Sequence, residues 1–294
     1  MLEDMIYAYI VQNSILPIST RRIHMKTYEK MVVIFVDLLG TKNNKKFDDK
    51  FFIHRLFHSE VKANENRKHE HVVFDRKVYS FSDCAYFFYY YKEGIDDSRK
   101  DDMKLIQIAM YNTSISLLRI LNAGYLIRGG IAFGDAYFDE LGFFGPAVEE
   151  AYSLESSYAD IPIVAINPEL GNNFLNWEES MTDQNIVNFL MTSRPMLVEK
   201  ECEKYFLNLF YSLEMTPNLQ LEEEEINIDD IKNNLYLTIS RDKQKYQLPQ
   251  NTNIQNKSTI YQKLDWFEKY LSTKHNRLRP EIAIGAFSGI VSGD

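Results

Sequence analysis

The sequence is poor in cysteine, in positive charge and in long apolar runs. Of its 294 residues only Cys84 and Cys202 are cysteines, and neither has a Cys or His at zinc-ligand spacing. A disulfide framework is therefore not expected, and a reducing cytoplasmic location fits best. No run approaches the roughly 20 apolar residues that a membrane span needs. The N-terminus lacks the basic leader of a signal peptide, so no membrane partner is expected.

The charge balance limits the partners in a second way. Lysine and arginine total 33 against 42 acids, which gives a net charge of −9. A general affinity for nucleic acid needs a basic field, so no nucleic-acid partner is expected. An acidic protein can still bind a triphosphate when metal ions neutralise the local charge. With 45% hydrophobic residues, the chain has enough apolar material for one large domain or one domain with a helical extension.

Hydrophobic periodicity predicts an alternating order of strands and helices. The expected elements are a strand over 31–36 buried on both faces, a helix over 48–63, hairpin strands over 72–74 and 78–81 with the turn at 75–77, the second strand continuing through Asp83 into 85–91, a helix over 101–123, a strand over 125–133, a hairpin from 136, a helix over 145–157 and a strand over 161–166. The first six elements follow the ferredoxin-like α+β pattern, an antiparallel sheet with helices on one face.

Local details divide the chain into three parts. The helix over 48–63 is expected to place Phe51, Phe52, Leu56 and Phe57 on one apolar stripe. Gly124 is expected to cap the helix over 101–123. After about residue 170 the character changes, with an acidic run at 222–225 and an amphipathic helix over 253–271. We expect an N-terminal segment over 1–30, a catalytic domain over 31–170 and a mainly helical extension over 171–294 packed on it.

Two aspartates stand where acids are costly. Asp37 follows an apolar strand, and Asp83 lies inside the segment SFSDCAYFF. Taken singly, each reads as the cap of a turn or helix. If the two strands are neighbours, however, both carboxylates point at one spot and favour a divalent cation between them. Two Mg²⁺ ions held in this way activate an attacking oxygen and neutralise a triphosphate.

The loop after Asp37 supports this interpretation. Gly40 allows a tight turn. The backbone amides of Leu39, Gly40 and Thr41 are then able to face phosphate oxygens.

Four ordered motifs resemble those of class III adenylyl and guanylyl cyclases. FVDLLGT, from Phe35, is similar to the first metal motif, and SFSD, ending at Asp83, to the second. Their aspartates are 83 − 37 = 46 residues apart, as in that family. IRGGIAFGDAY and GPAVEEAYSLE resemble the next strand and the helix after it. The resemblance spans roughly Met31–Pro168.

The resemblance implies roles for individual residues. Asp37 and Asp83 are implied to bind two Mg²⁺ or Mn²⁺ ions per site, with the Leu38 carbonyl as a further ligand. The residues implied to contact nucleotide are Phe35, Leu39, Gly40, Thr41, Tyr79 and Gly142. A homodimer with two shared sites is implied as well.

The departures from the purine cyclases are equally informative. Tyr79 and Gly142 stand where those enzymes read the base, and Glu149 and Ser153 replace their transition-state asparagine and arginine. This pattern is similar to the pyrimidine cyclases of bacterial Pycsar anti-phage systems. It implies that UTP or CTP becomes cUMP or cCMP, which a separate effector protein reads. Tyr79 also fits a plain role in core packing.

Arg128 is the candidate to replace the missing positive charge. It precedes Gly129–Gly130, whose backbone is expected to approach phosphate closely. A guanidinium here is able to stabilise charge on the α-phosphate or on leaving pyrophosphate. The alternative is an arginine in an ordinary surface ion pair. Two other functions stay open, a catalytically silent nucleotide-binding module and an adenylyl or guanylyl cyclase with an unusual base pocket.

Overall fold

A long central strand organises the fold. The computed structural model describes residues 27–41, 46–65, 72–181, 195–201, 203–216, 218–221, 224–245 and 258–275. Strand β1 (Glu29–Leu39) lies antiparallel between β3 (Cys84–Tyr91) and β4 (Leu126–Asp139). Both faces of β1 are buried, as predicted. The strand continues past Asp37, so this carboxylate belongs to the strand itself.

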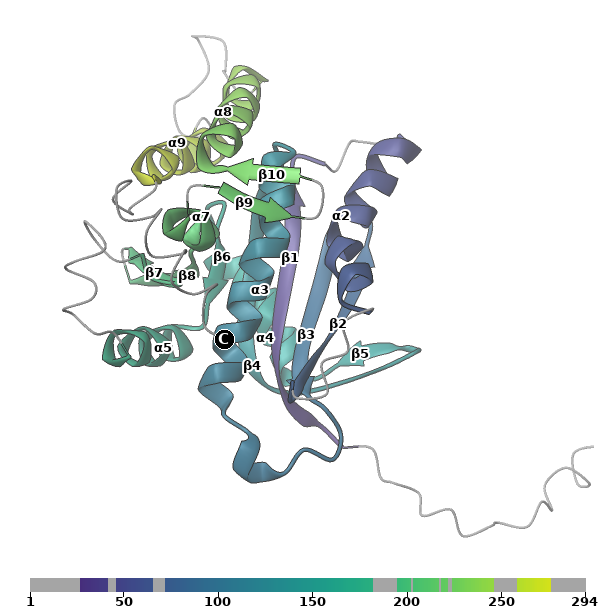
Figure 1. Cartoon of the computed structure of the whole chain (residues 1–294). Coiled ribbons are helices and arrows are strands. Elements are labelled where there is room, and N and C mark those ends of the chain that lie inside the picture. Colours follow the sequence, from purple (N-terminus) through teal and green to yellow (C-terminus); the bar gives the residue numbers. More distant parts are fainter. Residues whose placement is uncertain are drawn as a thin grey trace, which may run out of the picture.

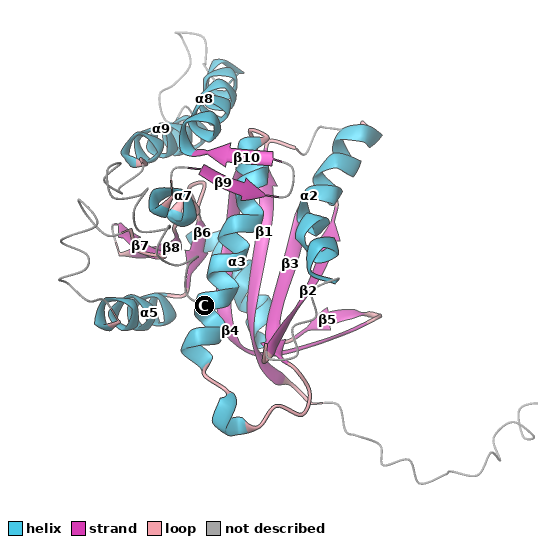
Figure 2. Ribbon diagram, viewed as in Figure 1, coloured by secondary structure: helices cyan, strands magenta, loops and turns pink. Residues whose placement is uncertain are grey.

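The eight-stranded sheet has the order β2-β3-β1-β4-β6-β8-β7, with β5 paired to the end of β4 (Figure 2). The remaining strands are β2 (Phe74–Phe81), β5 (Gly142–Phe144), β6 (Val164–Ile166), β7 (Val198–Glu201) and β8 (Lys204–Leu207). Among the strands that the structure describes, only the β4–β6 pair is parallel. The chain is therefore an α+β protein with a mostly antiparallel sheet, as the element order predicted.

Helices cover the two faces unequally. Helices α2 (Phe47–Glu65) and α3 (Asp102–Asn122) lie in front of the sheet, and α4 (Pro146–Ser153) lies behind it (Figure 1). In β1, Val32 and Ile34 pack toward α2 and α3, whereas Val33 and Phe35 belong to the cluster that includes α4. The ferredoxin-like unit thus keeps its two helices on one face. The opposite face, which the ferredoxin-like unit alone leaves bare, is partly covered by α4.

Close packing of α4 depends on glycine. A Cβ atom on Gly130 would lie 2.1 Å from the Ala151 carbonyl oxygen and 2.7 Å from Leu154 Cβ. Gly129 is equally crowded by the Phe35 carbonyl oxygen, at 2.3 Å. The expectation that this backbone approaches phosphate is therefore wrong, because protein atoms already fill the space beside it. The glycines instead bring α4, and the π-helical turn Leu154–Tyr158 after it, onto the sheet.

The hairpin before α3 differs from the prediction. Strand β2 is continuous from Phe74 to Phe81, and the turn lies at Ser82 and Asp83, with Ser82 at φ 59°. Residues 75–77, predicted as the turn, are in the strand and pair with β3. This is an edge strand, and charged side chains are common at sheet edges. Asp83 consequently belongs to a turn rather than to a strand.

The predicted stripe on α2 is also partly wrong. Phe51 is 50% exposed and Phe52 47% exposed, while Ile53 and Phe57 are buried. Helix α2 thus contacts the core through Leu56 and Phe57, as predicted, and through Ile53 in place of Phe51 and Phe52.

The C-terminal part extends the sheet and adds helices. It contains α5 (Pro168–Ser180), α7 (Tyr211–Met215), β9 (Asn218–Leu221), β10 (Glu224–Asn227), α8 (Ile228–Lys245) and α9 (Ser258–Thr273). Helix α8 joins the end of α3, since Asn234 donates to the Asn122 carbonyl (2.8 Å) and Thr238 to the Gly124 carbonyl (2.9 Å). Gly124, at φ 81°, caps α3 as predicted.

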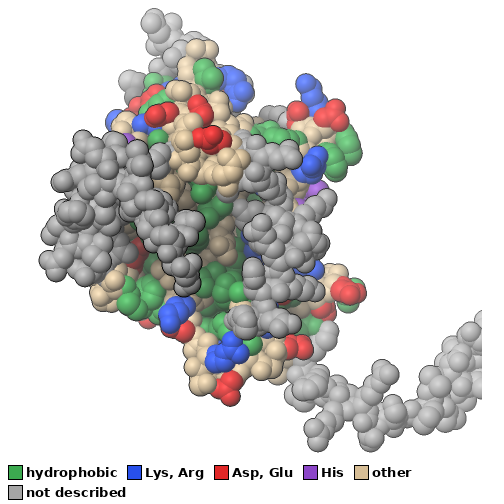
Figure 3. Space-filling view, viewed as in Figure 1, with side chains coloured by type: hydrophobic (Ala, Val, Ile, Leu, Met, Phe, Trp, Pro, Cys, Tyr) green, Lys and Arg blue, Asp and Glu red, His purple; other side chains and the backbone are tan. Residues whose placement is uncertain are grey.

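Several sequence predictions concern residues that the structure does not describe. The N-terminal segment up to residue 26, Cys202 and residues 222–223 of the acidic run lie outside the described residues. The predicted helix over 253–271 is found from Ser258 onward as α9, and residues 253–257 also lie outside the described residues. Acidic and basic side chains are interspersed on the face shown in Figure 3. In the part of the chain that the structure describes, no helix is long and apolar enough to cross a membrane.

Candidate active site

The fold brings the two predicted aspartates together. Asp37 pairs with Cys84 in the β1–β3 register, and the Leu38 amide donates to the Asp83 carbonyl at 3.0 Å. The turn after β2 is thereby attached to the end of β1. Burial raises the pKa of Asp37 above its usual value, and the charge of Asp83 raises it further. The two carboxylates are therefore close enough to repel each other.

Asp83 lies among hydrogen-bond donors. The Thr41 hydroxyl is 3.1 Å from the Leu38 carbonyl oxygen and also contacts the Asp83 carboxylate. Lys50 Nζ lies 3.6 Å from Asp83 Oδ2. Burial acts to raise the pKa of Asp83, but hydrogen bonds from Thr41 and Ser82 and the charge of Lys50 outweigh it, so this pKa is below its usual value. Asp83 is thus readily ionised, and Asp37 is less so.

Arg128 faces Asp37 from the other neighbouring strand. The two residues pair in the β1–β4 register, and Arg128 Nη2 lies 3.7 Å from Asp37 Oδ2. The guanidinium also forms an ion pair with Glu155, which is buried. Within the described residues the buried Arg128 Nε has no hydrogen-bond partner. Arg128 therefore lies beside Asp37 of the same chain and keeps one donor for a ligand.

Glu155 is a site residue that sequence reasoning missed. Its pKa is raised above the usual value, mainly by burial and further by the charge of Asp37, although Arg128 acts to lower it. Its position depends on the π-helical turn after α4 and on the close approach at Gly130. Neither feature has a recognisable sequence signal.

The donor set fits a hard divalent cation that shares a phosphate ligand. Mg²⁺ is usually held by one or two carboxylates, with phosphate oxygens and water completing its octahedron. Asp37, Asp83 and the Leu38 carbonyl match this pattern. No third acid, His or Cys completes a metal-holding group in the described ranges. Binding here would accordingly need the oxygens of a bound triphosphate.

Cationic side chains already lie beside both carboxylates. Arg128 is next to Asp37, and Lys50 is next to Asp83. An incoming cation competes with these two side chains for the carboxylates.

The residues predicted to read the base meet at the β4–β5 hairpin. The Tyr79 hydroxyl donates to the Asp139 carbonyl at 2.6 Å, and Gly142 pairs with Asp139 in the hairpin. Burial, followed by the charge of Asp139, raises the pKa of Tyr79. The Tyr79 ring packs 5.1 Å from the Phe143 ring. Tyr79 thus both packs in the core and holds the hairpin against β2.

Phe35 lies on the same face of β1 as Asp37. Its ring is 4.6 Å from the Tyr86 ring and 5.5 Å from the Tyr152 ring, and only 6% of the residue is exposed. It forms the buried floor of an aromatic group next to the carboxylates. Tyr152 is 54% exposed on α4 and is the accessible member of this group.

The predicted turn after Asp37 is found at Gly40, because Leu38 and Leu39 are still in β1 and Leu39 pairs with Leu126. Gly40 has φ 81°, the conformation that favours glycine. Asp242 of α8 lies close by, since a Cβ atom on Gly40 would be 3.7 Å from Asp242 Oδ2. Glu149 and Ser153, in contrast, are exposed on α4.

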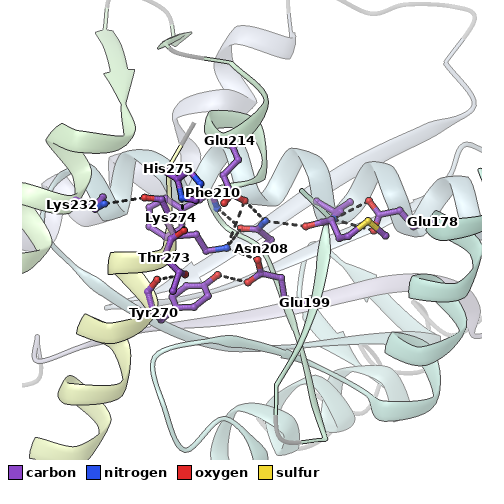
Figure 4. Close-up of polar contacts among 12 residues, drawn as sticks. Glu178, Glu199, Asn208, Phe210, Glu214, Lys232, Tyr270, Thr273, Lys274 and His275 are labelled. Atoms are coloured by element: carbon purple, nitrogen blue, oxygen red, sulfur yellow. Dashed lines mark hydrogen bonds and ion pairs between the residues drawn. The ribbon is translucent and has the colours of Figure 1, made fainter. Parts of the chain in front are cut away.

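A second polar cluster lies in the C-terminal part and was not predicted. We call it the Lys274 cluster; its members are Glu199, Asn208, Glu214, Tyr270 and Lys274 (Figure 4). Lys274 forms ion pairs with Glu199 and, at 3.7 Å, with Glu214, and donates to Asn208 Oδ1 at 3.1 Å. Tyr270 donates to Glu199 at 2.8 Å. The cluster joins the end of α9 to β7, β8 and α7.

Comparison with known proteins adds distant structural likenesses. No family model matches the sequence, and no curated protein is significantly similar to it. An adenylate/guanylate cyclase/hydrolase from Silicibacter pomeroyi matches 62% of this chain and 96% of its own, at 12% identity and a TM-score of 0.34. A bacterial light-regulated adenylyl cyclase matches 81% of this chain and 68% of its own, at 11% identity and a TM-score of 0.37. At these identities and TM-scores the likenesses carry no functional conclusion, so any function must be inferred from the residues of the site.

Proposed function

We propose that this chain is a nucleotidyl cyclase that converts a nucleoside triphosphate into a 3′,5′-cyclic monophosphate and pyrophosphate. The observation that carries the proposal is the meeting of Asp37 and Asp83 at the end of β1, where the Leu38–Asp83 backbone bond holds them. The raised pKa of Asp37 supports it, because a divalent cation would relieve the repulsion from Asp83. Arg128 adds a cation in the same row of the sheet.

The reaction needs positioning more than covalent chemistry. The 3′-hydroxyl loses its proton and attacks the α-phosphorus while pyrophosphate leaves in line. Two Mg²⁺ or Mn²⁺ ions, held by Asp37, Asp83 and the Leu38 carbonyl, would lower the pKa of that hydroxyl and neutralise triphosphate charge. In this proposal the amides of the turn at Gly40 and Thr41 face the phosphates, and Arg128 Nε donates to an α-phosphate oxygen. Arg128 does so while Glu155 holds the rest of its guanidinium.

The substrate base in this proposal is a pyrimidine, from UTP or CTP. Purine readers are polar side chains, whereas the Tyr79 hydroxyl here is engaged by the Asp139 carbonyl and Gly142 has no side chain. The resemblance to the Pycsar cyclases supports the same choice. It extends the proposal to cUMP or cCMP made during phage infection and read by a separate effector.

The proposed active form is a homodimer. Exposed side chains of α4, namely Glu149, Tyr152 and Ser153, lie on the sheet face that carries the carboxylates. A second protomer placed over this face would bring them to its own triphosphate site. Arg128 acts within its own protomer, because it lies beside its own Asp37. Light scattering of the active protein is expected to give the mass of two chains.

One observation favours a second candidate, a nucleotide-binding module without turnover. Both carboxylates already have a cationic partner from the same chain, Arg128 for Asp37 and Lys50 for Asp83. If these pairs persist when nucleotide binds, the cations needed for cyclisation have no ligands. Such a module would bind a triphosphate and leave it unchanged.

Product analysis tests the proposal directly. The purified chain is incubated with Mn²⁺ and each of ATP, GTP, CTP and UTP, and products are identified by mass spectrometry. We expect cUMP or cCMP with pyrophosphate, well above cAMP and cGMP. A preference for a purine would refute the base assignment and leave the cyclase. Binding of a triphosphate without any product would establish the silent module instead.

The control for this assay is an aspartate of the same type outside the site. Asp97 has a 94% exposed side chain and pairs only with the nearby Lys100 among the contacts of the described chain. Asp97→Ala is expected to leave product formation unchanged, whereas Asp37→Ala and Asp83→Ala abolish it.

A further inference from the structure

Two histidines on α2 converge on one oxygen atom. His54 and His58 are one helical turn apart, a spacing that places both side chains on the same face. His54 Nδ1 lies 3.0 Å and His58 Nε2 lies 2.9 Å from Ser80 Oγ of β2. The two imidazole rings are 4.7 Å apart, centroid to centroid. Three potential ligand atoms from a helix and a strand thus meet at one point, between α2 and β2.

The spacing of these atoms is that of ligands around one transition-metal ion. With metal–nitrogen bonds of about 2.0–2.1 Å, neighbouring ligand atoms of a tetrahedral or octahedral ion lie about 2.9–3.4 Å apart. Both nitrogen–oxygen separations at Ser80 are at the short end of this range. A small shift of the imidazoles is enough to admit an ion between them and the hydroxyl.

The protonation of the pair also suits metal binding. Ligand imidazoles must be neutral. Burial lowers the pKa of His58, and the charges of His54 and Arg76 lower it further. Moreover, the Ser80 hydroxyl has one proton, so one imidazole accepts from it while the other donates to it. The imidazole that accepts this proton is therefore neutral, as a metal ligand must be.

The surroundings select the type of ion. No Asp, Glu or Cys joins the two histidines in a metal-holding group within the described ranges. Lys50, one turn before His54, and Arg76 on β2 add positive charge nearby. Mg²⁺ and Ca²⁺ need oxygen ligands and negative charge, so they are disfavoured. Imidazole nitrogen instead suits Zn²⁺, Ni²⁺ and Cu²⁺.

We propose that His54, His58 and Ser80 form a binding site for a transition-metal ion of the Zn²⁺, Ni²⁺ and Cu²⁺ group. Water completes the coordination on the side where His54 is exposed. The site is separate from the Asp37–Asp83 pair and prefers a different class of ion. A bound ion links α2 to β2, two residues before the turn that carries Asp83, and so stabilises the folded chain.

Titration of the untagged chain with Ni²⁺ and with Zn²⁺, in the absence of nucleotide, tests this site by calorimetry. We expect one equivalent to bind, with no competition from a large excess of Mg²⁺, and the melting temperature to rise. The informative variants are His54→Asn and His58→Gln, whose side-chain amides keep a hydrogen bond to Ser80 but are poor metal ligands. Each is expected to weaken the binding of Ni²⁺ and Zn²⁺ by roughly 100-fold. Loss of a direct ligand should cost at least as much affinity as loss of an outer-shell partner does.

His275→Asn is the matched control. Its Nδ1 contacts only the nearby Thr273 carbonyl at 2.8 Å among the contacts of the described chain, so Ni²⁺ affinity should not change. The proposal is overturned if the wild-type chain binds neither ion, or if the Asn and Gln variants bind as tightly as the wild type. Because no nucleotide is present, neither result bears on cyclase activity.

Discussion

The Lys274 cluster and the Asp37–Asp83 pair are both charged groups at the ends of strands, but their exposure differs. Lys274 is 1% exposed and Glu214 is fully buried. The side chains of Asp37 and Asp83 keep 30% and 22% of their surface exposed. Lys274 and Glu214 of the first group are thus closed to solvent and, of its charged side chains, only Glu199 is partly exposed, at 21%, whereas both carboxylates of the second group are partly exposed.

Their internal charge balance differs as well. In the Lys274 cluster a single ammonium is shared by two carboxylates, an amide oxygen and a tyrosine ring 4.6 Å away. At the candidate site Asp83 repels Asp37, and Arg128, the cationic partner of Asp37, is also held by Glu155. The first arrangement thus stabilises the fold, whereas the second leaves Asp37 beside a like charge that a bound cation would neutralise.

The largest effect on stability is expected from Lys274→Met. Removing one partner of a buried ion pair leaves the other charge uncompensated, which costs about 3–5 kcal/mol. The free energy of unfolding in urea measures this loss. Lys269→Met is the control, because Lys269 is 78% exposed and pairs with Asp265 on the surface, where such pairs contribute about 0–1 kcal/mol. Equal effects of the two substitutions would contradict the structural role of the Lys274 cluster.

Gly130→Ala is expected to be next in size. The new methyl group would collide with the Ala151 backbone, so α4 must shift, and overpacking of this kind costs about 1–3 kcal/mol. The shift also moves Glu155 away from Arg128, so turnover should fall together with stability. Gly134→Ala provides the comparison, since its Cβ would have a normal 3.7 Å contact with Ala147. If Gly134→Ala were the more harmful of the two, the packing account would fail.

Glu155→Gln is expected to alter the metal requirement. With its carboxylate gone, Arg128 pairs more closely with Asp37 and competes with the incoming cation. The Mn²⁺ concentration for half-maximal activity should rise by roughly tenfold, which corresponds to about 1.4 kcal/mol. Glu149→Gln, on the exposed face of α4, serves as the control. An unchanged Mn²⁺ requirement in Glu155→Gln would show that Arg128 does not restrain Asp37.

The smallest effect concerns pH, where the two aspartates act with opposite signs. The folded pKa of Asp37 lies above its usual value of 3.8, so as pH rises past 3.8 the unfolded chain loses this proton first and stability falls. The folded pKa of Asp83 lies below 3.8, so its contribution is present above 3.8 and is lost as pH falls below it.

Asp37→Asn should consequently gain stability relative to wild type as pH rises past 3.8. Asp83→Asn should become less stable than wild type as pH rises toward 3.8. Thermal unfolding of the three proteins across these ranges provides the measurement. The same trend in both variants would contradict the opposite pKa shifts.

Short-range patterns in the sequence predicted much of the fold and the centre of the site. Asp37 was predicted because an acid follows a run of apolar residues. The cap at Gly124 was predicted because a glycine follows a helix with regular apolar spacing. The turn at residues 75–77 was wrong because charged residues are typical both of turns and of exposed edge strands. Which of the two applies to Arg76 depends on the pairing of β2 with β3.

Residues fixed by distant contacts could not be predicted. Glu155 is buried only because Gly130 admits α4 to the sheet, and Lys274 only because α9 closes on β7 and β8. Phe51 and Phe52 were assigned to the core because both are large and apolar. The rotation of α2 on the sheet exposes them and buries Ile53 instead.

Turnover of Asp37→Ala, Asp83→Ala and the double variant, each compared with the wild type, tests the central claim most directly. Residues that act as one unit show strongly non-additive losses. We expect each single substitution to reduce cyclic-nucleotide formation by roughly 1,000-fold or more, and the double variant to lose little beyond that. Retention of a tenth or more of the wild-type rate in either single variant, or losses that multiply in the double variant, would contradict the proposal that Asp37 and Asp83 form one catalytic site.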